Sequence, residues 1–306
     1  MVLKATVAGM VADQLVDFTG SPFSHDGVTY DVFHKPGVSG GPPRVRPRNE
    51  ESGRESTSEV SRDVEPTLAP RPAVIVMAEI PGITPTVADF ARRVADRGLN
   101  VYMPDLFGVA GEPRSAKAML KVLPKACVAR EFSALALRTT APIVEWLRAL
   151  ARHANEECGQ AGVGAVGMCF TGGFALAMAT EPEMLAPVMS QPSLPMFFRP
   201  GARDDAGCSD ADLAKVLRRC RDDDLQVMGL RFSEDRLSPK GRFSLLNQVL
   251  GQSFIEVPID SGCRNPSGHS LFAHSVLTED LIDRPGEPTR AALEQVLDFL
   301  EQRLAG

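Results

Sequence analysis

Six short apolar runs recur along the chain after residue 70, and segments with helical spacing separate them. The runs span residues 73–78, 99–104, 163–166, 187–190, 225–232 and 254–259. Each is too short for an ordinary helix, and a continuous apolar run of this length is typical of a strand buried on both faces. Helical segments are predicted near residues 87–97, 117–156, 172–179, 210–221, 239–250 and 289–304. This alternation predicts one doubly wound α/β domain, with a mostly parallel central sheet and helices on both faces.

The N-terminal part of the chain departs from this pattern. Residues 23–34 alternate around Asp26-Gly27, which predicts a β-hairpin, and residues 1–36 are assigned to an N-terminal segment of the same domain. Residues 37–70 contain no aromatic residue and only six apolar ones. Such a segment buries too little apolar surface to offset the entropy of ordering it, so we predict a disordered insertion of open role. Residues 71–306 form the predicted core.

Composition excludes several classes of protein. The 306 residues carry a formal net charge of −6 at pH 7, so the chain lacks the excess of Lys and Arg that nucleic-acid binding exploits. No apolar run approaches the ~18 residues of a membrane span, and the N-terminus does not have the pattern of a signal peptide. The six cysteines form no CxxC pair, which argues against a disulfide framework and a structural zinc site. We expect a cytoplasmic protein without metal or cofactor; its oligomeric state stays open.

One strand leads into a sequence that suits a catalytic nucleophile. Residues 167–173 read Gly-Met-Cys-Phe-Thr-Gly-Gly, close to the pattern G-x-Nu-x-G with Cys169 as the nucleophile (Nu), just before a predicted helix. A sharp strand-to-helix turn of this kind exposes its nucleophile at the tip of the sheet, where the helix dipole favours a thiolate. A buried structural cysteine is the competing interpretation. A dinucleotide-binding motif at Gly162, Gly164 and Gly167 is disfavoured, because it lies within the strand instead of after it.

Later strands end close to residues that could complete a catalytic triad. The run 225–232 is followed by Asp235, with Glu234 as its rival for the role of the acid. The run 254–259 leads into a loop that carries His269 and His274, two of only five histidines in the chain. Nucleophile, acid and histidine thus follow one another in the chain order of α/β-hydrolases. The sequence leaves open which histidine would be the base.

With these motifs in place, the sequence resembles the dienelactone hydrolase family, whose members are α/β-hydrolases with a cysteine nucleophile. The resemblance covers about residues 71–304 and depends on four places: Glu79-Ile80-Pro81-Gly82 after the first long strand, Pro104-Asp105-Leu106, the turn at 167–173, and His274-Ser275. It implies the α/β-hydrolase fold and hydrolysis of an ester or lactone through an acyl-cysteine. It also implies a role for each site residue: Cys169 as nucleophile, His274 as base, Asp235 as the orienting acid, the amides of Ile80 and Phe170 as oxyanion hole, and Glu79 as a carboxylate that controls the thiol.

Two departures from the family pattern bear on function. Thr171 stands where the family usually has glycine, and no arginine follows His274 to hold a substrate carboxylate. Whether Arg130 or Arg236 replaces it is open, as is the physiological substrate. The expected partner is a small-molecule ester or lactone. The alternative hypothesis is a non-catalytic protein of the same fold that binds a ligand or senses oxidation through its thiol, and Thr171 favours it.

Overall fold

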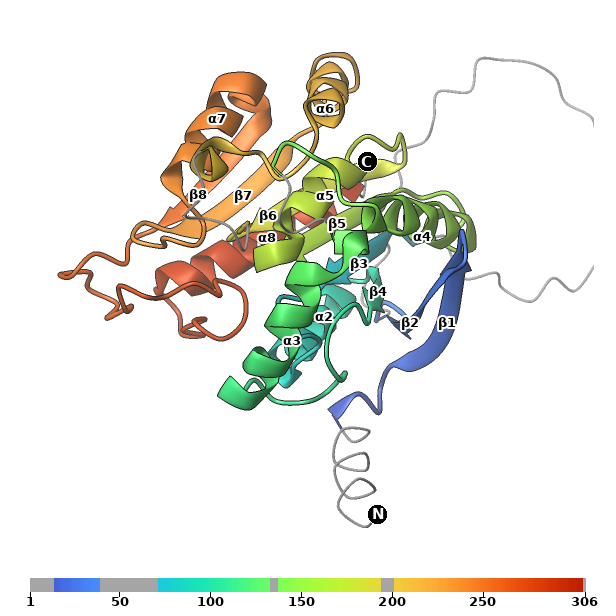
Figure 1. Ribbon diagram of the computed structural model, residues 1–306, viewed down its shortest axis with the longest axis horizontal. Helices are drawn as coiled ribbons and strands as arrows, with labels where there is room; N and C mark the ends of the chain where they lie inside the picture. The colour runs from blue at the N-terminus through green and yellow to red at the C-terminus, as the bar shows by residue number, and fades with distance from the viewer. Residues whose placement is uncertain (1–13, 39–70, 133–136, 194–200, 305–306) are drawn as a thin grey trace, which may run out of the picture.

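Residues 14–38, 71–132, 137–193 and 201–304 are described by the structure, a computed structural model (Figure 1). Most of the predicted disordered insertion therefore lies outside the described residues. The strands follow one another as β1 (Thr19–His25), β2 (Val28–Lys35), β3 (Ala73–Met77), β4 (Asn100–Pro104), β5 (Val163–Met168), β6 (Met184–Ser190), β7 (Val227–Phe232) and β8 (Phe254–Ile259). The α-helices are α2 (Pro85–Asp96), α3 (Ala116–Val128), α4 (Ile143–Glu157), α5 (Gly172–Met178), α6 (Asp210–Asp222), α7 (Lys240–Leu250) and α8 (Pro288–Leu304).

These strands form one sheet in the order β1-β2-β4-β3-β5-β6-β7-β8. The pairs β1–β2 and β2–β4 are antiparallel, and all the other pairs are parallel. β1 and β2 form a hairpin whose turn residues, Asp26 and Gly27, both have positive φ angles. Two residues with positive φ suit the right-handed twist of the strands that they connect. The predicted mostly parallel sheet is confirmed.

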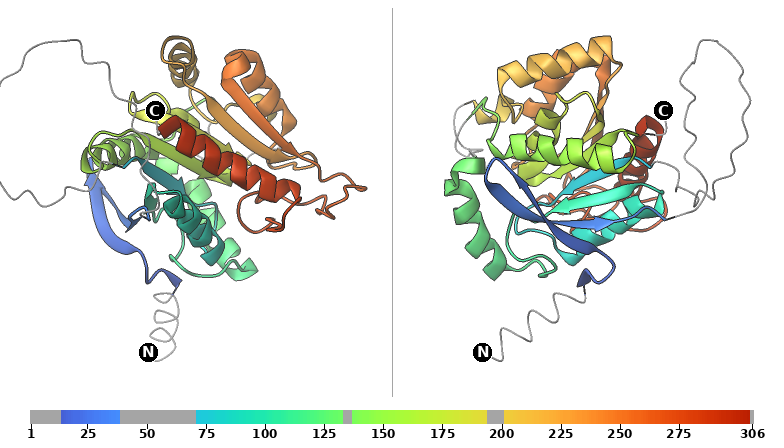
Figure 2. Two further views of the ribbon diagram at one scale, coloured as in Figure 1. Left: turned by 180° about the vertical axis from the view of Figure 1, so that it is seen from behind. Right: turned by 90° about the vertical axis from the view of Figure 1, so that its right-hand side faces the viewer.

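Helices cover both faces of the sheet (Figures 1 and 2). One buried apolar cluster joins the sheet to α4 and α5 together with parts of α3, α6 and α7. A second cluster joins the opposite face to α2 and α8, which lie side by side in the left view of Figure 2. The central strands are buried on both faces for this reason, and β3 and β5 consist of buried residues throughout. The continuous apolar runs of the sequence reflect this double burial.

The helix α2 shows how local sequence sets an element and its direction. Thr84 caps it by accepting a hydrogen bond from the amide of Val87 at 3.4 Å, and Pro85 occupies the first turn, where its missing N–H is not needed. Its buried residues recur at helical spacing and face the sheet. The predicted helical region 117–156 proves to be α3, a short 3-10 turn η1 (Arg130–Phe132) and α4.

The parallel strands place their carboxyl ends at one edge of the sheet. The segments that follow β3, β5, β6, β7 and β8 therefore emerge at this edge, and they carry Glu79, Cys169, Ser193, Asp235 and His274 in that order. In open parallel sheets this is the edge at which ligands bind.

Candidate active site

Cys169 lies in a tight turn between β5 and α5. The strand ends at Met168, and a 3-10 turn, η2 (Cys169–Thr171), leads directly into the helix. Cys169 has a φ of +54°, an uncommon conformation for a residue with a side chain. A Cβ at Gly167 would lie 2.2 Å from the backbone oxygen of Thr171, so the chain closes this tightly only with glycine there. The predicted strand–turn–helix at Cys169 is present in the structure.

Thr171, the departure from the family pattern, holds the same turn together. Its hydroxyl is completely buried, accepts a hydrogen bond from the amide of Met168 at 2.8 Å and lies 3.0 Å from the carbonyl oxygen of Met77, to which it can donate. It thus ties the end of β5 to the end of β3. Threonine here supports the turn by side-chain hydrogen bonds, and the turn forms without the glycine of the family.

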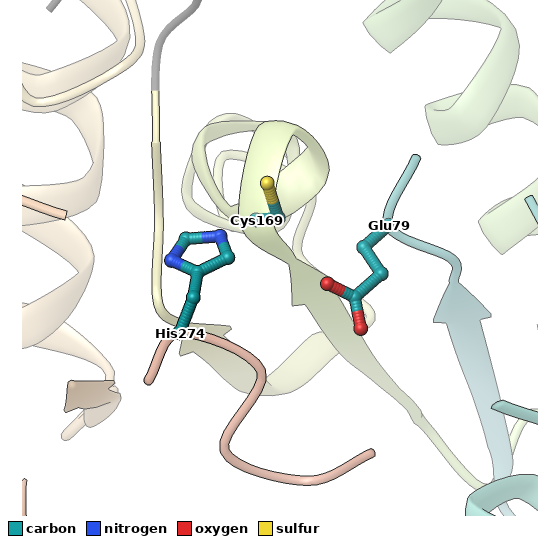
Figure 3. Close-up of side chains that lie close together, drawn as sticks. All are labelled: Glu79, Cys169 and His274. Carbon is teal, nitrogen blue, oxygen red and sulfur yellow. The ribbon is translucent and has the colours of Figure 1, made fainter. Parts of the chain in front are cut away.

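Three side chains from distant segments meet at this turn (Figure 3). The Cys169 sulfur, a ring nitrogen of His274 and a carboxylate oxygen of Glu79 all lie within 4.8 Å of one another. Figure 3 shows the imidazole on one side of Cys169 and the carboxylate on the other. Cys169 is partly exposed, whereas Glu79 and His274 are buried. The nucleophile candidate is thus the most exposed residue of the three.

His274 is held by Asp235. The Nδ1 atom of His274 lies 2.7 Å from Oδ2 of Asp235, and both side chains are buried. The other carboxylate oxygen of Asp235 accepts hydrogen bonds from the amides of Leu237 and Ser238 at 2.9 and 3.2 Å, which fixes the carboxylate. Burial by itself lowers the pKa of His274, but the negative charge of Cys169 and the hydrogen bond to Asp235 outweigh it and raise that pKa well above 6.5. The arrangement favours the protonated form of the His274 ring.

The two candidate histidines occupy different places. The amide of His274 donates to Asp280 at 2.8 Å, which fixes the loop that points the ring toward Cys169. The ring of His269 instead packs against Phe232 in a tilted arrangement with centroids 5.0 Å apart, and its main chain is held by the side chain of Asn265. It is not part of the group around the sulfur. The rival acid, Glu234, is exposed, and its carboxylate lies 3.4 Å from the hydroxyl of Ser233.

Glu79 is a buried acceptor of two hydroxyl groups. Ser275 donates to one of its carboxylate oxygens at 2.7 Å, and Thr278 donates to the other. The guanidinium of Arg114 lies 4.0 Å from Glu79 and donates to the hydroxyl of Ser275 at 3.1 Å. These contacts compensate for the burial of the carboxylate. They also bring Arg114 to the edge of the site.

The sequence did not reveal which arginine lies at the site. Of the two candidates, Arg236 is exposed, and the side chain of Arg130 lies outside the description. Arg114 precedes α3 and has no neighbour in the sequence that would mark it as part of the site. Ser193, whose hydroxyl lies 2.9 Å from the Cys169 sulfur, was also missed, because no motif accompanies it.

The amides of Ile80 and Phe170 occupy equivalent positions past the edge of the sheet. β3 and β5 are parallel neighbours with Met77 opposite Gly167, and the two residues lie three positions beyond this pair. Ile80 directly follows Glu79, and Phe170 directly follows Cys169. The two segments thus emerge beside each other next to the sulfur.

A cavity of about 340 Å³ lies beside the turn. Its walls come from Pro81 and Gly82, from the loop after β4, and from the face of α3 that carries Val122 and Ala126. Two of its lining residues, Phe107 and Phe132, pack against the ring of Phe170 with centroids 6.0 Å away. Neither Cys169 nor His274 lines the cavity. It therefore adjoins the thiol site through Phe170 without enclosing it.

The described residues contain one possible group of metal ligands and no helix that could span a membrane. Glu79, Cys169 and His274 form the one group of three potential metal ligands found among the described residues. Both oxygens of Glu79 already accept hydrogen bonds from hydroxyls. Within the part of the chain that the structure describes, no helix has both the length and the apolarity to cross a bilayer.

Comparison with known proteins agrees with this fold. A model of the dienelactone hydrolase family matches residues 61–192, and no curated protein matches the sequence. Among solved structures, a protein of Klebsiella pneumoniae subsp. pneumoniae assigned as a dienelactone hydrolase is 17% identical, with a TM-score of 0.57 over 93% of this chain and 99% of its own. Est1E from Butyrivibrio proteoclasticus is 8% identical, with a TM-score of 0.52 over 94% and 99%. A thermostable esterase is 12% identical, with a TM-score of 0.52 over 93% and 63%.

At these identities the solved structures establish the fold, and the family match adds the class of activity, that of a hydrolase. The matched residues include Glu79, Ile80, Cys169 and Phe170, four of the residues singled out from the sequence. The resemblance to the dienelactone hydrolase family is confirmed over residues 61–192, and the described chain has the α/β-hydrolase fold.

Proposed function

We propose that this protein hydrolyses an ester or lactone through an acyl-cysteine intermediate. The observation that carries the proposal is the sulfur of Cys169 at a strand–helix turn, close to an imidazole whose far nitrogen is 2.7 Å from a buried carboxylate. A nucleophile, a base and a group that orients the base are the three parts of a covalent hydrolase site. Small-molecule esters or lactones are the substrates that such a site would take.

In the proposed reaction the Cys169 thiolate attacks the carbonyl carbon and forms a tetrahedral intermediate. The imidazolium of His274 then gives its proton to the departing alkoxide, which leaves as an alcohol and yields a thioester. The neutral imidazole takes a proton from water, which attacks the thioester and releases the acid and the thiolate. The raised pKa of His274 supports this order of events, because a protonated ring is available as the acid of the first step.

The oxyanion that develops during both attacks needs hydrogen-bond donors. The amides of Ile80 and Phe170 are proposed for this role, since they follow Glu79 and Cys169 on adjacent parallel strands. Loss of one such donor would cost on the order of 3 kcal/mol of transition-state stabilisation. Glu79 is proposed to modulate the thiol through its negative charge, which opposes a second negative charge on the sulfur nearby.

The surroundings of the site bear on the class of substrate. Arg114 lies 4.0 Å from Glu79 and half-exposed at the edge of the site, so it is the arginine that the geometry favours for holding a carboxylate of the substrate. The adjoining cavity has walls that are mainly apolar near Phe107 and Phe132, and its charged lining residues are two lysines and two glutamates, Lys121, Lys125, Glu112 and Glu131. It suits an apolar part of the substrate that does not react.

The proposal is tested by replacing the nucleophile. Cys169→Ala should abolish hydrolysis of an activated ester such as p-nitrophenyl acetate, while intact-protein mass spectrometry of the wild type after rapid quenching should detect the acylated enzyme. Cys263→Ala is the matched control, because Cys263 is an exposed thiol with no place in the site. Hydrolysis at the wild-type rate in Cys169→Ala would exclude the proposed mechanism and leave the ligand-binding or thiol-sensing alternative.

A further inference from the structure

Ser193 is a close polar neighbour of the Cys169 sulfur. Its Oγ lies 2.9 Å from Sγ, and Ser193 is buried. A hydroxyl can accept a hydrogen bond from a thiol and can donate one to a thiolate. Because a hydrogen bond to an ionised group is roughly twice as strong as one between neutral groups, this hydroxyl favours the thiolate form of Cys169 over the thiol.

Two local contacts seat Ser193 against the turn. Its amide donates to the backbone oxygen of Cys169 at 2.9 Å, so the same residue binds both the main chain and the sulfur of the nucleophile. A Cβ at Gly172, the first residue of α5, would lie 2.7 Å from Pro192. The absence of a side chain there lets the segment after β6 approach the start of the helix. The segment is thereby packed directly on the turn.

A buried arginine also binds the segment that carries Ser193. Arg242, in α7, is almost completely buried and donates to the carbonyl oxygens of Pro192 and Asp205, the latter at 2.5 Å. Burial lowers the pKa of Arg242 to about 10, opposed by the charges of Asp205 and Cys169. The guanidinium is therefore a buried cation that holds the peptide before Ser193 and is electrostatically coupled to the sulfur.

We propose that Ser193 is a further catalytic residue: its hydroxyl donates a hydrogen bond to the Cys169 thiolate and holds the sulfur ready at the turn until a substrate carbonyl arrives. Ser193 keeps its own proton, and no covalent bond forms or breaks at it. Arg242 is the positioning residue, because it acts through the Pro192 carbonyl. The charged groups around the sulfur are His274 from the loop after β8, Glu79 after β3, and Arg242 from α7. Ser193 is the neutral donor among them.

The test measures the thiolate directly and needs no ester substrate. The reduced full-length protein is alkylated with iodoacetamide between pH 5 and pH 10, and the rate at Cys169 is followed by peptide mass spectrometry. Ser193→Ala should slow alkylation at low pH at least about tenfold, because hydrogen bonds to charged groups contribute that much or more. The rates should converge at the alkaline end of this range, because the hydrogen bond is then no longer needed to keep a thiol ionised. Ser193→Thr, which keeps the hydroxyl, should restore most of the rate.

The controls separate a local effect from a structural one. Thr180→Val removes a buried hydroxyl at the other end of α5, where it bonds to Ala177, and should leave the alkylation profile unchanged. Ser193→Gly removes the same hydroxyl as Ser193→Ala and carries the test if the alanine variant does not fold. A rate within twofold of the wild type at every pH would overturn the proposal. So would a loss of equal size at all pH values, which indicates a structural change.

The proposed role of Ser193 rests on the proposed function only for its effect on ester turnover. If Cys169→Ala still hydrolyses esters, the proposed function fails, yet the alkylation profile still reports whether Ser193 stabilises the thiolate. If Cys169→Ala is inactive and Ser193→Ala alkylates as the wild type does, the proposed function stands and the role of Ser193 fails.

Discussion

Replacing Asp235 with asparagine is the sharpest test of the histidine at this site. The Oδ1 atom of Asp235 accepts hydrogen bonds from two amides, so the amide oxygen of asparagine would stay on that side. Its NH2 group would then face Nδ1 of His274 at the place of Oδ2, 2.7 Å away. A donor in this position forces Nδ1 to be an acceptor and places the proton of the neutral ring on Nε2. The nitrogen that faces the sulfur could no longer take up a proton.

The size of the effect follows from the contact. Two unit charges about 4 Å apart interact by about 4 kcal/mol at an effective dielectric constant of 20, and a hydrogen bond to a charged group contributes about 1.5–3 kcal/mol net. A loss of about 3 kcal/mol corresponds to roughly a hundredfold lower kcat/KM. Because the charge and hydrogen bond of Asp235 help to raise the pKa of His274, Asp235→Asn should also lower that pKa. The alkaline limb of the pH–rate profile should therefore move to lower pH.

The assay compares kcat/KM for p-nitrophenyl acetate between pH 6 and pH 10. Asp260→Asn is the matched control, because Asp260 also follows a strand at this edge of the sheet, is exposed, and accepts a hydrogen bond from the amide of Gly262. It should retain wild-type activity. Activity of Asp235→Asn within threefold of the wild type at pH 7, or an equal loss in Asp260→Asn, would refute the reasoning.

Three further predictions concern the base, the turn at Cys169 and the protonation of Asp105, which follows β4. His274→Ala should reduce kcat for activated esters at least about a hundredfold, whereas His269→Ala should reduce it less than about fivefold; equal losses would contradict the assignment. Gly167→Ala should lower the free energy of unfolding by about 1–3 kcal/mol in urea titrations, because its Cβ would meet the backbone oxygen of Thr171, and an unchanged midpoint would contradict this. Burial and the charge of Asp31 raise the pKa of Asp105 to about 6, so the stability associated with its neutral form is present below about pH 4 and is lost as the pH rises through 6. Asp105→Asn should therefore stabilise the fold by about 1 kcal/mol at pH 8, after allowance for solvent screening, and much less at pH 4.5, as measured by thermal unfolding; equal effects at both pH values would contradict it.

The groups gathered around Cys169 differ in how far the sequence reveals them. Glu79, Cys169 and His274 each stand beside a strand end or within a motif, and the structure brings all three together. Ser193 and Arg114 stand in no motif, and only the packing of their segments brings them to the site. The positions of Ile80 and Phe170 follow from the register of β3 and β5, which the folded sheet places side by side.

The two histidines show a limit of prediction from local sequence patterns. They lie five residues apart in one loop, and in the sequence only the resemblance of His274-Ser275 to the dienelactone hydrolase family distinguishes them. Asn265 fixes the main chain of His269 beside Phe232, and Asp280 fixes that of His274 beside the sulfur. Both contacts involve side chains and form only when the loop is folded. The folded loop therefore determines which histidine lies beside the sulfur.

The sequence alone determined the layers of this protein. Parallel strands that are buried on both faces produce continuous apolar runs, and the segments with helical spacing between these runs form the crossover helices. Local periodicity therefore predicts the architecture. It also determined the turn at Cys169, because only glycine at position 167 permits so close an approach of the chain. Tertiary structure decided which loop residues meet. Loops lack a repeating pattern, and their conformation depends on contacts between segments far apart in the chain, such as Arg242 with Pro192 and Asp235 with His274.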